Sequence, residues 1–479
     1  MKRYYIVLVV ALWVAKPVCA QTAAQWRADL RMLSSALTTV HPEPFHDTAP
    51  ETFRAAVRSL DVNAAKLTQN QILVRMLGIV AMLKDAHTQL HIPPTNRFPV
   101  RLYKFGDGIF VTGVRAEDAS RLGAEVITIN GKMAAAVYDS VQTIAAGDNP
   151  FSRMEAVPRF ISDPRIINGL GLGDTTAIRL ELKLKDGTRT EWTVSRSSDA
   201  PTLFERTDAG LYQLRRDGDM LYVKFNAVQD SVVAYARRIV AIIDSSSIDK
   251  LVIDLRDNGG GNNDFAKTAV TIIARSRINE RGHLFVITGR RTYSAAMNFT
   301  SLLEDQTRAI FVGEAPGGSP HHYGDATLFT LPNSKMNFTV STLHWSLGVQ
   351  PMDVRITMEP DIAAPPRHDD VVNGKDAALD SIRSYTPNRP YGSSVQQMLK
   401  AAWASIPNAK GRAEIFATFK AVTDAYPNSH EAWFDRARVY AFVRDWKGAA
   451  ESLRRASALR PQNALIKRML AAAELREVT

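Results

Sequence analysis

The stretch that decides the fold reads Leu251-Val-Ile-Asp-Leu-Arg-Asp-Asn-Gly-Gly-Gly261-Asn262. An apolar run, typical of a buried strand, passes directly into three glycines and then into a helix-like segment from Asp264 to Ala274. A turn of this kind exposes backbone N–H groups without a side chain to block close approach, and such groups bind an anion. The anion is either a phosphate or the oxyanion of an acyl-transfer intermediate. The spacing matches neither a P-loop nor G-x-G-x-x-G, which argues against a nucleotide site; the alternative is a tight structural turn.

The segments around this stretch alternate between strand and helix patterns, which predicts an α/β core over residues 201–365. The predicted strands are Leu221–Phe225, Leu251–Leu255, His283–Thr288, Ala309–Gly313 and Phe338–Leu343, and the helix Ser231–Ser245 separates the first two.

A second motif, Thr292-Tyr-Ser-Ala-Ala-Met297, follows one of these strands and opens an apolar helix. A serine at this position is commonly a helix N-cap. Ser294 has a second interpretation, because two small residues follow it and Ala295 would offer a backbone N–H beside the glycine turn. The motif is therefore compatible with either a cap or a nucleophile.

The chain outside the core divides by pattern into four further regions. Residues 21–97 carry apolar residues at helical spacing, and residues 98–200 show short alternating strands between glycine-bearing turns. Residues 366–394 are rich in Pro, Asp, Asn and Ser and are expected to form a linker. Residues 395–479 are Ala-rich and helical, and the 34-residue period from Pro427 to Pro461 resembles one tetratricopeptide repeat. The alternative for this last region is a plain helical cap on the core.

Residues 1–20 have the pattern of a cleaved secretory signal peptide. Lys2 and Arg3 precede an apolar run of twelve residues, Tyr4 to Ala15, and small residues precede Gln21. Twelve residues are too few to span about 30 Å of hydrocarbon, so a stable membrane span is not expected after cleavage. The only cysteine, Cys19, lies in this segment, so the mature chain has no cysteine nucleophile or ligand. We expect a periplasmic or secreted protein.

The composition of the 479 residues is that of a soluble globular protein. Hydrophobic residues make up 45% and charged residues 23%, which excludes collagen, wholesale disorder and a polytopic membrane protein. The formal charge is +10, but no basic stripe marks a nucleic-acid surface. None of the ten histidines has the spacing of a metal site, and we expect no metal and no cofactor.

Together the two motifs resemble the C-terminal processing (tail-specific) serine protease family. The resemblance covers roughly residues 25–365 and includes Val312-Gly-Glu-Ala-Pro-Gly-Gly318 and Met358-Glu-Pro-Asp-Ile362. Leu122-Gly-Ala-Glu-Val-Ile-Thr-Ile-Asn-Gly131 looks like the PDZ-like module of these proteases. The resemblance implies an α/β, crotonase-like protease core with a helical N-terminal region, a PDZ-like β insertion over residues 98–200 and a C-terminal TPR-like addition.

The resemblance also implies roles for individual residues. Ser294 would be the nucleophile, and the N–H of Gly260 or Gly261, together with that of Ala295, would form the oxyanion hole. Better-known members use a lysine about 25 residues after the serine, but no lysine occurs from Ser294 through Ser334. The Ser–Lys dyad is therefore absent.

The tricorn-like branch of the family uses a histidine from the N-terminal helical region. Leu83-Lys-Asp-Ala-His-Thr88 resembles its histidine stretch, which implies that His87 is the general base. Ala86 stands where that branch has a serine. The acid that orients the histidine would be Asp353 or Glu359, and we prefer Asp353.

These features favour an exported serine endopeptidase that hydrolyses peptide bonds through a serine acyl-enzyme. The partner would be a polypeptide substrate or a chain end, and the C-terminal repeat would offer a further protein contact. The alternative is a non-catalytic peptide-binding protein of the same fold. The absence of a G-x-S-x-G elbow argues against an α/β-hydrolase.

Overall fold

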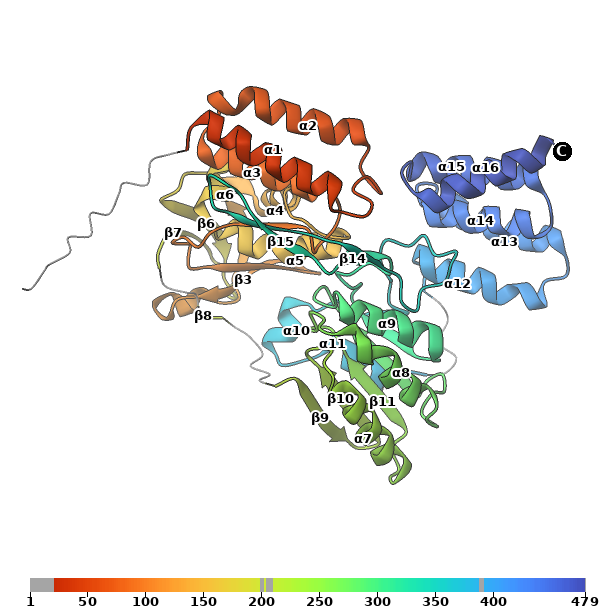
Figure 1. The fold of residues 1–479 in the computed structure, drawn as a ribbon. Coiled ribbons are helices and arrows are strands. Elements are labelled where there is room, and N and C mark those ends of the chain that lie inside the picture. Colours follow the sequence, from red (N-terminus) through yellow and green to blue (C-terminus); the bar gives the residue numbers. More distant parts are fainter. Residues whose placement is uncertain (1–20, 199–201, 204–209, 387–391, 479) are drawn as a thin grey trace, which may run out of the picture.

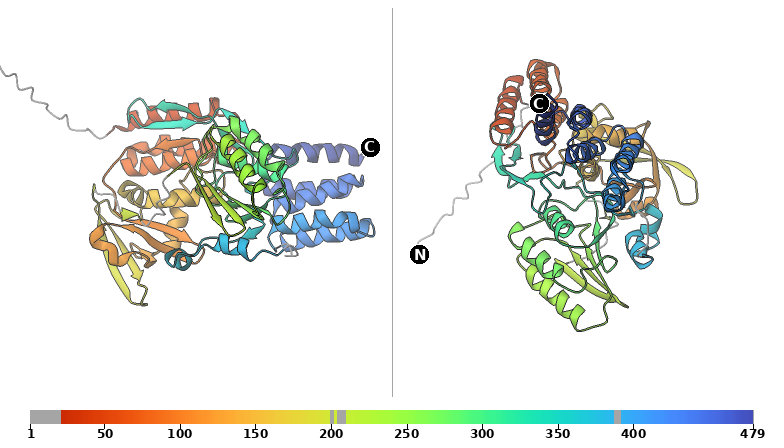
Figure 2. Two further views of the ribbon diagram at one scale, coloured as in Figure 1. Left: turned by 90° about the horizontal axis from the view of Figure 1, so that it is seen from below. Right: turned by 90° about the vertical axis from the view of Figure 1, so that its right-hand side faces the viewer.

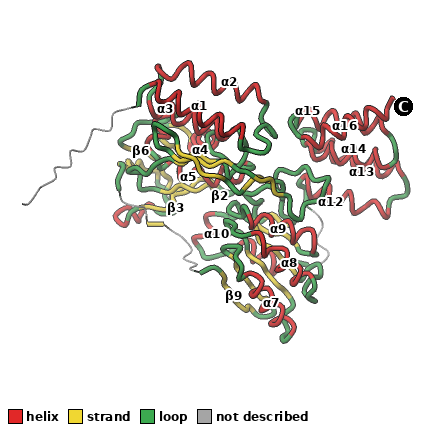
Figure 3. Tube along the Cα trace, in the orientation of Figure 1, coloured by secondary structure: helices red, strands yellow, loops and turns green. Residues whose placement is uncertain are grey.

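The computed structural model describes residues 21–198, 202–203, 210–386 and 392–478. The two ends of the chain are helical, whereas strands and helices alternate in its middle; Figure 3 distinguishes the helices from the strands. The predicted signal peptide, with Cys19, lies outside the described residues. Among the residues described, no helix combines the length and apolar character needed to cross a membrane.

A six-stranded sheet forms the centre of the α/β core. Its strand order is β18-β13-β12-β11-β10-β9, and all neighbours are parallel except β9, which is antiparallel to β10. The strands are β9 (Tyr212–Asp217), β10 (Met220–Phe225), β11 (Lys250–Asp254), β12 (Leu284–Thr288), β13 (Ile310–Gly313) and β18 (Ile362–Ala363). The motifs around Gly260 and Ser294 follow β11 and β12, so both lie at the carboxyl end of this sheet.

Different helices cover the two faces of this sheet. Because side chains alternate along a strand, Leu221 and Leu251 pack towards one set of helices, whereas Tyr222 and Val252 pack towards the opposite face. The helices of the first face lie together beside β10 and β11 (Figure 1). They are α7 (Val232–Asp244), α8 (Ala266–Ala274), which follows the short 3₁₀ turn η3 (Asn263–Phe265), and α9 (Ala295–Gln306).

The expected linker over residues 366–394 contains two helices, α10 (His368–Val372) and α11 (Ala377–Arg383). Side chains of α11 pack on the second face of the core sheet, where Ile382 belongs to the same apolar cluster as Phe285. One of the polar residues that suggested a linker caps a helix instead: the Asp376 side chain accepts hydrogen bonds from the first N–H groups of α11. This part of the chain therefore belongs to the core.

The two predicted regions 21–97 and 98–200 share one hydrophobic core. The helical elements of the first are α1 (Ala23–Thr39), α2 (Pro50–Asn63), η1 (Ala64–Lys66) and α3 (Gln69–Ala81). The second holds a mainly antiparallel sheet of β2 (Arg101–Phe105), β3 (Gly108–Val114), β4 (Glu125–Ile129), β5 (Lys132–Met133), β6 (Ala177–Lys183), β7 (Arg189–Ser195) and β8 (Thr202–Leu203). It also contains η2 (Ala116–Arg121), α4 (Ala134–Gln142), α5 (Pro150–Ile161) and α6 (Pro164–Gly169). The PDZ-like character of this region stays a prediction.

A β arm reaches from the α/β core to the N-terminal helices. It consists of β14 (His322–Gly324), β15 (Thr327–Thr330), β16 (Asn337–Val340) and β17 (Leu343–Trp345), and β16 pairs antiparallel with β1 (Gln89–His91). The predicted strand Phe338–Leu343 is thus divided between β16 and β17 and is not part of the core sheet. Phe338 is fully buried in the N-terminal core instead.

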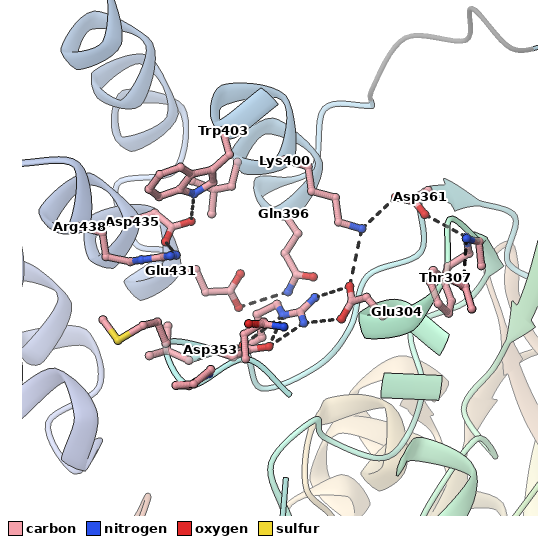
Figure 4. Close-up of a pocket in the computed structure, with 18 of the residues that line it drawn as sticks. Glu304, Thr307, Asp353, Asp361, Gln396, Lys400, Trp403, Glu431, Asp435 and Arg438 are labelled. Carbon is pink, nitrogen blue, oxygen red and sulfur yellow. Dashed lines mark hydrogen bonds and ion pairs between the residues drawn. The ribbon is translucent and has the colours of Figure 1, made fainter. Parts of the chain in front are cut away.

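The C-terminal region is a stack of helices beside the N-terminal helices and the core (Figures 1 and 2). Its elements are α12 (Val395–Ser405), η4 (Ile406–Asn408), α13 (Arg412–Ala425), α14 (His430–Phe442), α15 (Trp446–Leu459) and α16 (Ala464–Val478). A cavity of about 610 Å³ lies at its junction with the core. There, Lys400 pairs with Asp361 at 2.9 Å, and Gln396 contacts Glu431 (Figure 4). The tetratricopeptide resemblance stays a prediction.

Replacing Ile382 by alanine tests whether α11 is part of the core. Ile382 is 0% exposed, so we expect Ile382→Ala to lower the free energy of unfolding by about 2–5 kcal/mol. Ser381→Ala, at a partly exposed position of the same helix, is the control and should change it by less than about 0.5 kcal/mol. Urea unfolding followed by circular dichroism measures both; equal effects would place α11 outside the core.

Candidate active site

Ser294 lies between β12 and α9 in a backbone conformation that non-glycine residues rarely adopt, with φ 56° and ψ −129°. Such a conformation costs about 1–3 kcal/mol and persists only where neighbouring contacts impose it. Two contacts do so here: Thr292 Oγ1 donates to Leu255 O at 2.8 Å, and Tyr293 N donates to Asn258 O at 3.1 Å. The Ser294 side chain makes no capping hydrogen bond, so the N-cap interpretation is not what the structure shows.

His87 faces this serine from the N-terminal unit. Its Nε2 lies 3.0 Å from Ser294 Oγ, although the two residues are 207 positions apart in sequence. The imidazole stacks on the Tyr293 ring at a centroid distance of 4.4 Å. Burial lowers the pKa of His87, an effect that Asp85 partly offsets, so the ring is neutral at neutral pH and its nitrogen can accept a proton.

Asp85 fixes the loop that carries His87. Its carboxylate accepts hydrogen bonds from the main-chain N–H of His87 at 2.8 Å and from Thr88 Oγ1 at 2.5 Å, and His41 Nε2 is 3.3 Å from it. Burial acts to raise the pKa of Asp85, but hydrogen bonds from His41, Ser341 and Thr88 outweigh it and hold the pKa below its usual value. A permanent negative charge therefore lies beside the histidine.

Asp353 is not placed where the sequence led us to expect it. Its carboxylate binds Arg355, with Oδ2 2.6 Å from Nη2 and Oδ1 2.8 Å from the main-chain N–H. No described acid contacts Nδ1 of His87, which is buried without a hydrogen-bond partner, although the main chain of Tyr323 acts to raise the His87 pKa. The pairing of Asp353 with His87 is therefore corrected: an arginine two residues away takes this carboxylate. Glu359 instead lies against α12, where its N–H donates to Gln396.

The glycine turn lies directly against the serine. A Cβ at Gly260, whose φ is +108°, would be 2.7 Å from Ser294 Cβ and 3.0 Å from Ala295 N, so only glycine fits there. The Gly260 N–H donates to Asn258 Oδ1 at 2.9 Å and is not available to an oxyanion.

The N–H of Gly261 is the remaining donor of the turn. The main-chain N–H of Val228 donates to Gly260 O at 2.9 Å, and Val228 O accepts a hydrogen bond from Asn262 N at 2.8 Å. These two bonds flank Gly261, whose own N–H therefore points away from Val228. Neither this N–H nor that of Ala295 has an acceptor among the described residues. Of the three predicted oxyanion residues, Gly261 and Ala295 thus keep free donors.

Asn258, His322 and Asp148 also belong to the site, and the sequence analysis did not identify them. Asn258 is 0% exposed and bonds both the glycine turn and Tyr293. His322 is buried, with its ring 6.2 Å from that of His87 and its Nδ1 3.0 Å from Ser319 O. Only Asn258 had a usable signal, because it lies within the quoted glycine stretch.

Asp148 connects the base loop to the segment before the β arm. Its carboxyl accepts hydrogen bonds from Ala86 N at 2.7 Å and Ser319 N at 3.3 Å. Burial, followed by repulsion from Asp85, raises the pKa of Asp148 to about 8. At neutral pH one of these two neighbouring acids is therefore ionised and the other is mainly protonated.

No group of three or more His, Cys, Asp or Glu side chains in the described part of the chain is arranged to hold a metal ion.

Comparison with solved structures identifies proteins that have a similar fold. No protein-family model and no curated protein matches the sequence. Among solved structures, mature CPAF in complex with lactacystin has a TM-score of 0.57 at 14% identity, over 75% of this chain and 97% of that chain. Mature CPAF in a second structure has a TM-score of 0.53 at 13% identity, over 81% and 99% of the two chains.

The photosystem II D1 C-terminal processing protease is a weaker match, with a TM-score of 0.35 at 16% identity over 74% of this chain and 98% of that one. The chain therefore has the fold of CPAF. The resemblance seen in the sequence is confirmed at this level.

The charge state of His322 gives a first test of the site. Burial, followed by repulsion from His87, lowers the pKa of His322 to about 4. In the unfolded chain a histidine binds a proton near pH 6.5, whereas His322 in the folded protein does so only near pH 4. The free energy of unfolding therefore decreases as the pH falls from about 6.5 to about 4. In ¹³C-histidine NMR spectra, with His322→Gln for assignment, we expect the His322 ring to stay neutral at pH 5. A midpoint near 6.5 would contradict the buried, neutral state.

Proposed function

We propose that this protein is an exported serine endopeptidase that cleaves polypeptides through a Ser294 acyl-enzyme. The observation that carries the proposal is the 3.0 Å contact between Ser294 Oγ and His87 Nε2, made by a serine held at a positive φ. The fold that the chain shares with CPAF supports it. Export rests on the sequence pattern of residues 1–20.

In the proposed reaction, neutral His87 takes the Ser294 hydroxyl proton as Oγ attacks the scissile carbonyl. The N–H groups of Gly261 and Ala295 would stabilise the oxyanion, each by about 3 kcal/mol in the transition state. The protonated His87 then gives its proton to the leaving amine, and a water molecule activated by the same histidine hydrolyses the acyl-enzyme. The negative charge of Asp85 favours the imidazolium that forms in between.

This assignment needs no lysine. His87 occupies the hydrogen-bonding position at Ser294 Oγ that the base of a Ser–Lys dyad would need, so the chemistry of the pair is that of serine and histidine. Asp85 would be a positioning residue, because it holds the main chain of His87 and does not bond the imidazole.

A non-catalytic peptide-binding protein is the second candidate. One observation favours it: no described carboxylate contacts Nδ1 of His87, which must carry the proton when Nε2 accepts from serine, and only a main-chain hydrogen bond of Tyr323 acts on the ring. The imidazolium therefore lacks the carboxylate acceptor of a complete triad.

Cleavage of an unfolded protein separates the two candidates. We expect the mature chain to degrade reduced casein and to lose at least about 10³-fold in rate as Ser294→Ala, because the nucleophilic oxygen is removed. Thr300→Ala, a buried hydroxyl on the same helix that bonds only Ala296 O, is a matched control and should retain activity. Lactacystin, bound by CPAF in its crystal, should block the parent enzyme. A parent as inactive as Ser294→Ala would refute the peptidase and favour the binding protein.

The pH dependence of cleavage tests His87 as the base. Because burial lowers its pKa, His87 stays neutral below the usual histidine range, and activity is lost only as the pH falls through this lowered value. We expect the acidic limb of kcat/KM against pH to have its midpoint below about 6.5. His87→Ala should abolish that limb together with most of the activity. Full activity in His87→Ala would disprove the assignment.

A further inference from the structure

A second cavity, of about 290 Å³, lies next to the base and is closed on one side by the C-terminal helices. Its walls include His322 and Ser319 from the site and Arg460, Asn463 and Arg468 from the segment around the start of α16. The ring of His322 is 6.2 Å from that of His87, so one lining residue of the cavity lies beside His87. The C-terminal region therefore forms part of the wall of a cavity that adjoins the site.

The C-terminal helices are fixed in this place by direct contacts. Arg460 pairs with Asp47 of the N-terminal unit at 2.9 Å, and His430 Nε2 is 2.9 Å from Val354 O. Val354 itself belongs to the apolar cluster of α14, α15 and α16. Apolar packing, a hydrogen bond and an ion pair thus hold the C-terminal helices in position beside the cavity.

Two cations of this cavity have no direct ion-pair partner. Lys84 and Arg468 line it, and their side chains make no hydrogen bond or ion pair with another described residue. Burial and repulsion by Arg153 and Arg460 lower the pKa of Lys84, and attraction by Asp47 partly offsets this effect, so other cations lie near Lys84. An anionic group bound there would relieve this repulsion.

The carboxyl groups that line the cavity already have partners. Asp47 pairs with Arg460, Asp353 with Arg355, and Glu43 accepts a hydrogen bond from the Tyr323 hydroxyl at 3.0 Å. Asp148 is mainly protonated at neutral pH, since its pKa is raised to about 8. None of them makes a direct ion pair with Lys84 or Arg468, although the charge of Asp47 attracts Lys84.

The first turn of α16 adds to the positive potential of this wall. Ala464 and Leu465 line the cavity, and their N–H groups have no acceptor among the described residues. Asn463 caps the helix through Ile466 N at 3.0 Å, which fixes the direction of this turn.

We infer that this cavity binds a carboxylate of the polypeptide substrate, held by Lys84, Arg468 and the first turn of α16. The inference rests on the proposed peptidase function for its substrate class, and it adds that the C-terminal helices select the substrate. A carboxylate can come from an acidic side chain or from a free chain end, and both present the same two oxygens to these cations.

Binding to the inactive Ser294→Ala protein tests this inference without requiring cleavage. Three fluorescein-labelled peptides of one neutral sequence are compared: an amidated one, an amidated one with an internal glutamate, and one with a free C-terminal carboxylate. We expect at least one carboxylate peptide to bind about tenfold more tightly than the neutral amide. The advantage should decrease when the salt concentration rises from about 0.1 M to about 1 M. The peptide that gains affinity identifies the source of the carboxylate.

Charge-removing variants connect the preference to this cavity. In the Ser294→Ala background, Arg468→Gln and Lys84→Gln should each reduce the affinity advantage of the carboxylate peptide over the neutral amide, and the double variant should abolish this advantage. Arg468 is exposed, so its replacement keeps the fold even if Lys84→Gln does not. Arg455→Gln removes an exposed arginine of α15 that does not line the cavity, and it should leave the advantage unchanged.

Equal affinity for all three peptides, or an advantage that survives in Arg468→Gln and in the double variant, would overturn the inference. Failure of the peptidase proposal is a separate result: carboxylate-dependent binding combined with no cleavage by the parent protein would leave a binding protein with this same pocket.

Discussion

The contact between Ser294 Oγ and His87 Nε2 depends on two hydrophobic cores being held in register. His87 lies between Leu83 and Leu90, which are buried in the N-terminal core, whereas the residues after Ser294 are buried in the core of the α/β sheet. Neither unit contains both residues of this contact. The 3.0 Å spacing is therefore a property of how the two units dock. A displacement of about 1 Å is enough to reduce such chemistry by about two orders of magnitude.

Polar groups make much of this docking. Arg290, beside the Ser294 loop, pairs with Glu314 at 2.7 Å and also donates to Lys104 O of the β region at 2.6 Å. Asn149 Nδ2 donates to Pro316 O at 3.1 Å. Because buried polar groups are costly unless every partner is in place, contacts of this kind define one relative position of the two units more sharply than apolar packing does. The β arm adds backbone pairing between β1 and β16 directly after His87. The position of His87 is thus determined from both sides.

Much of the core could be predicted from the sequence, because its signals are local. The apolar run into Gly260 and Gly261 predicted a buried strand and a donor turn, and the structure has both, with β11 covering residues 250–254. Ser294 and His87 were found through short motifs. The acid was not, because the predicted Asp353 binds Arg355, only two residues away, and no described acid contacts the His87 ring. The free N–H could be assigned to Gly261 only once Asn258 was seen to occupy that of Gly260.

The segments that were misjudged are short. Helix α11 has seven residues, too few for its apolar period to stand out against a polar segment. Strand β16 pairs with β15 but also with β1, which lies about 250 residues away, and β17 pairs with β14, so no local pattern could show that these strands lie outside the core sheet. His322 and Asp148 carry no motif at all. Both lie near the base only because the β arm and the segment before α5 converge there.

The central claim is that the protein makes Ser294 nucleophilic by placing it against His87 and between free backbone donors. Reaction of the mature chain with a fluorophosphonate, followed by mass spectrometry of the digested protein, tests this most directly. The account predicts a single adduct on Ser294, formed in the parent and lost or greatly slowed in His87→Ala, with other serines unmodified. An unreactive Ser294, or equal labelling in the presence and absence of His87, would contradict it.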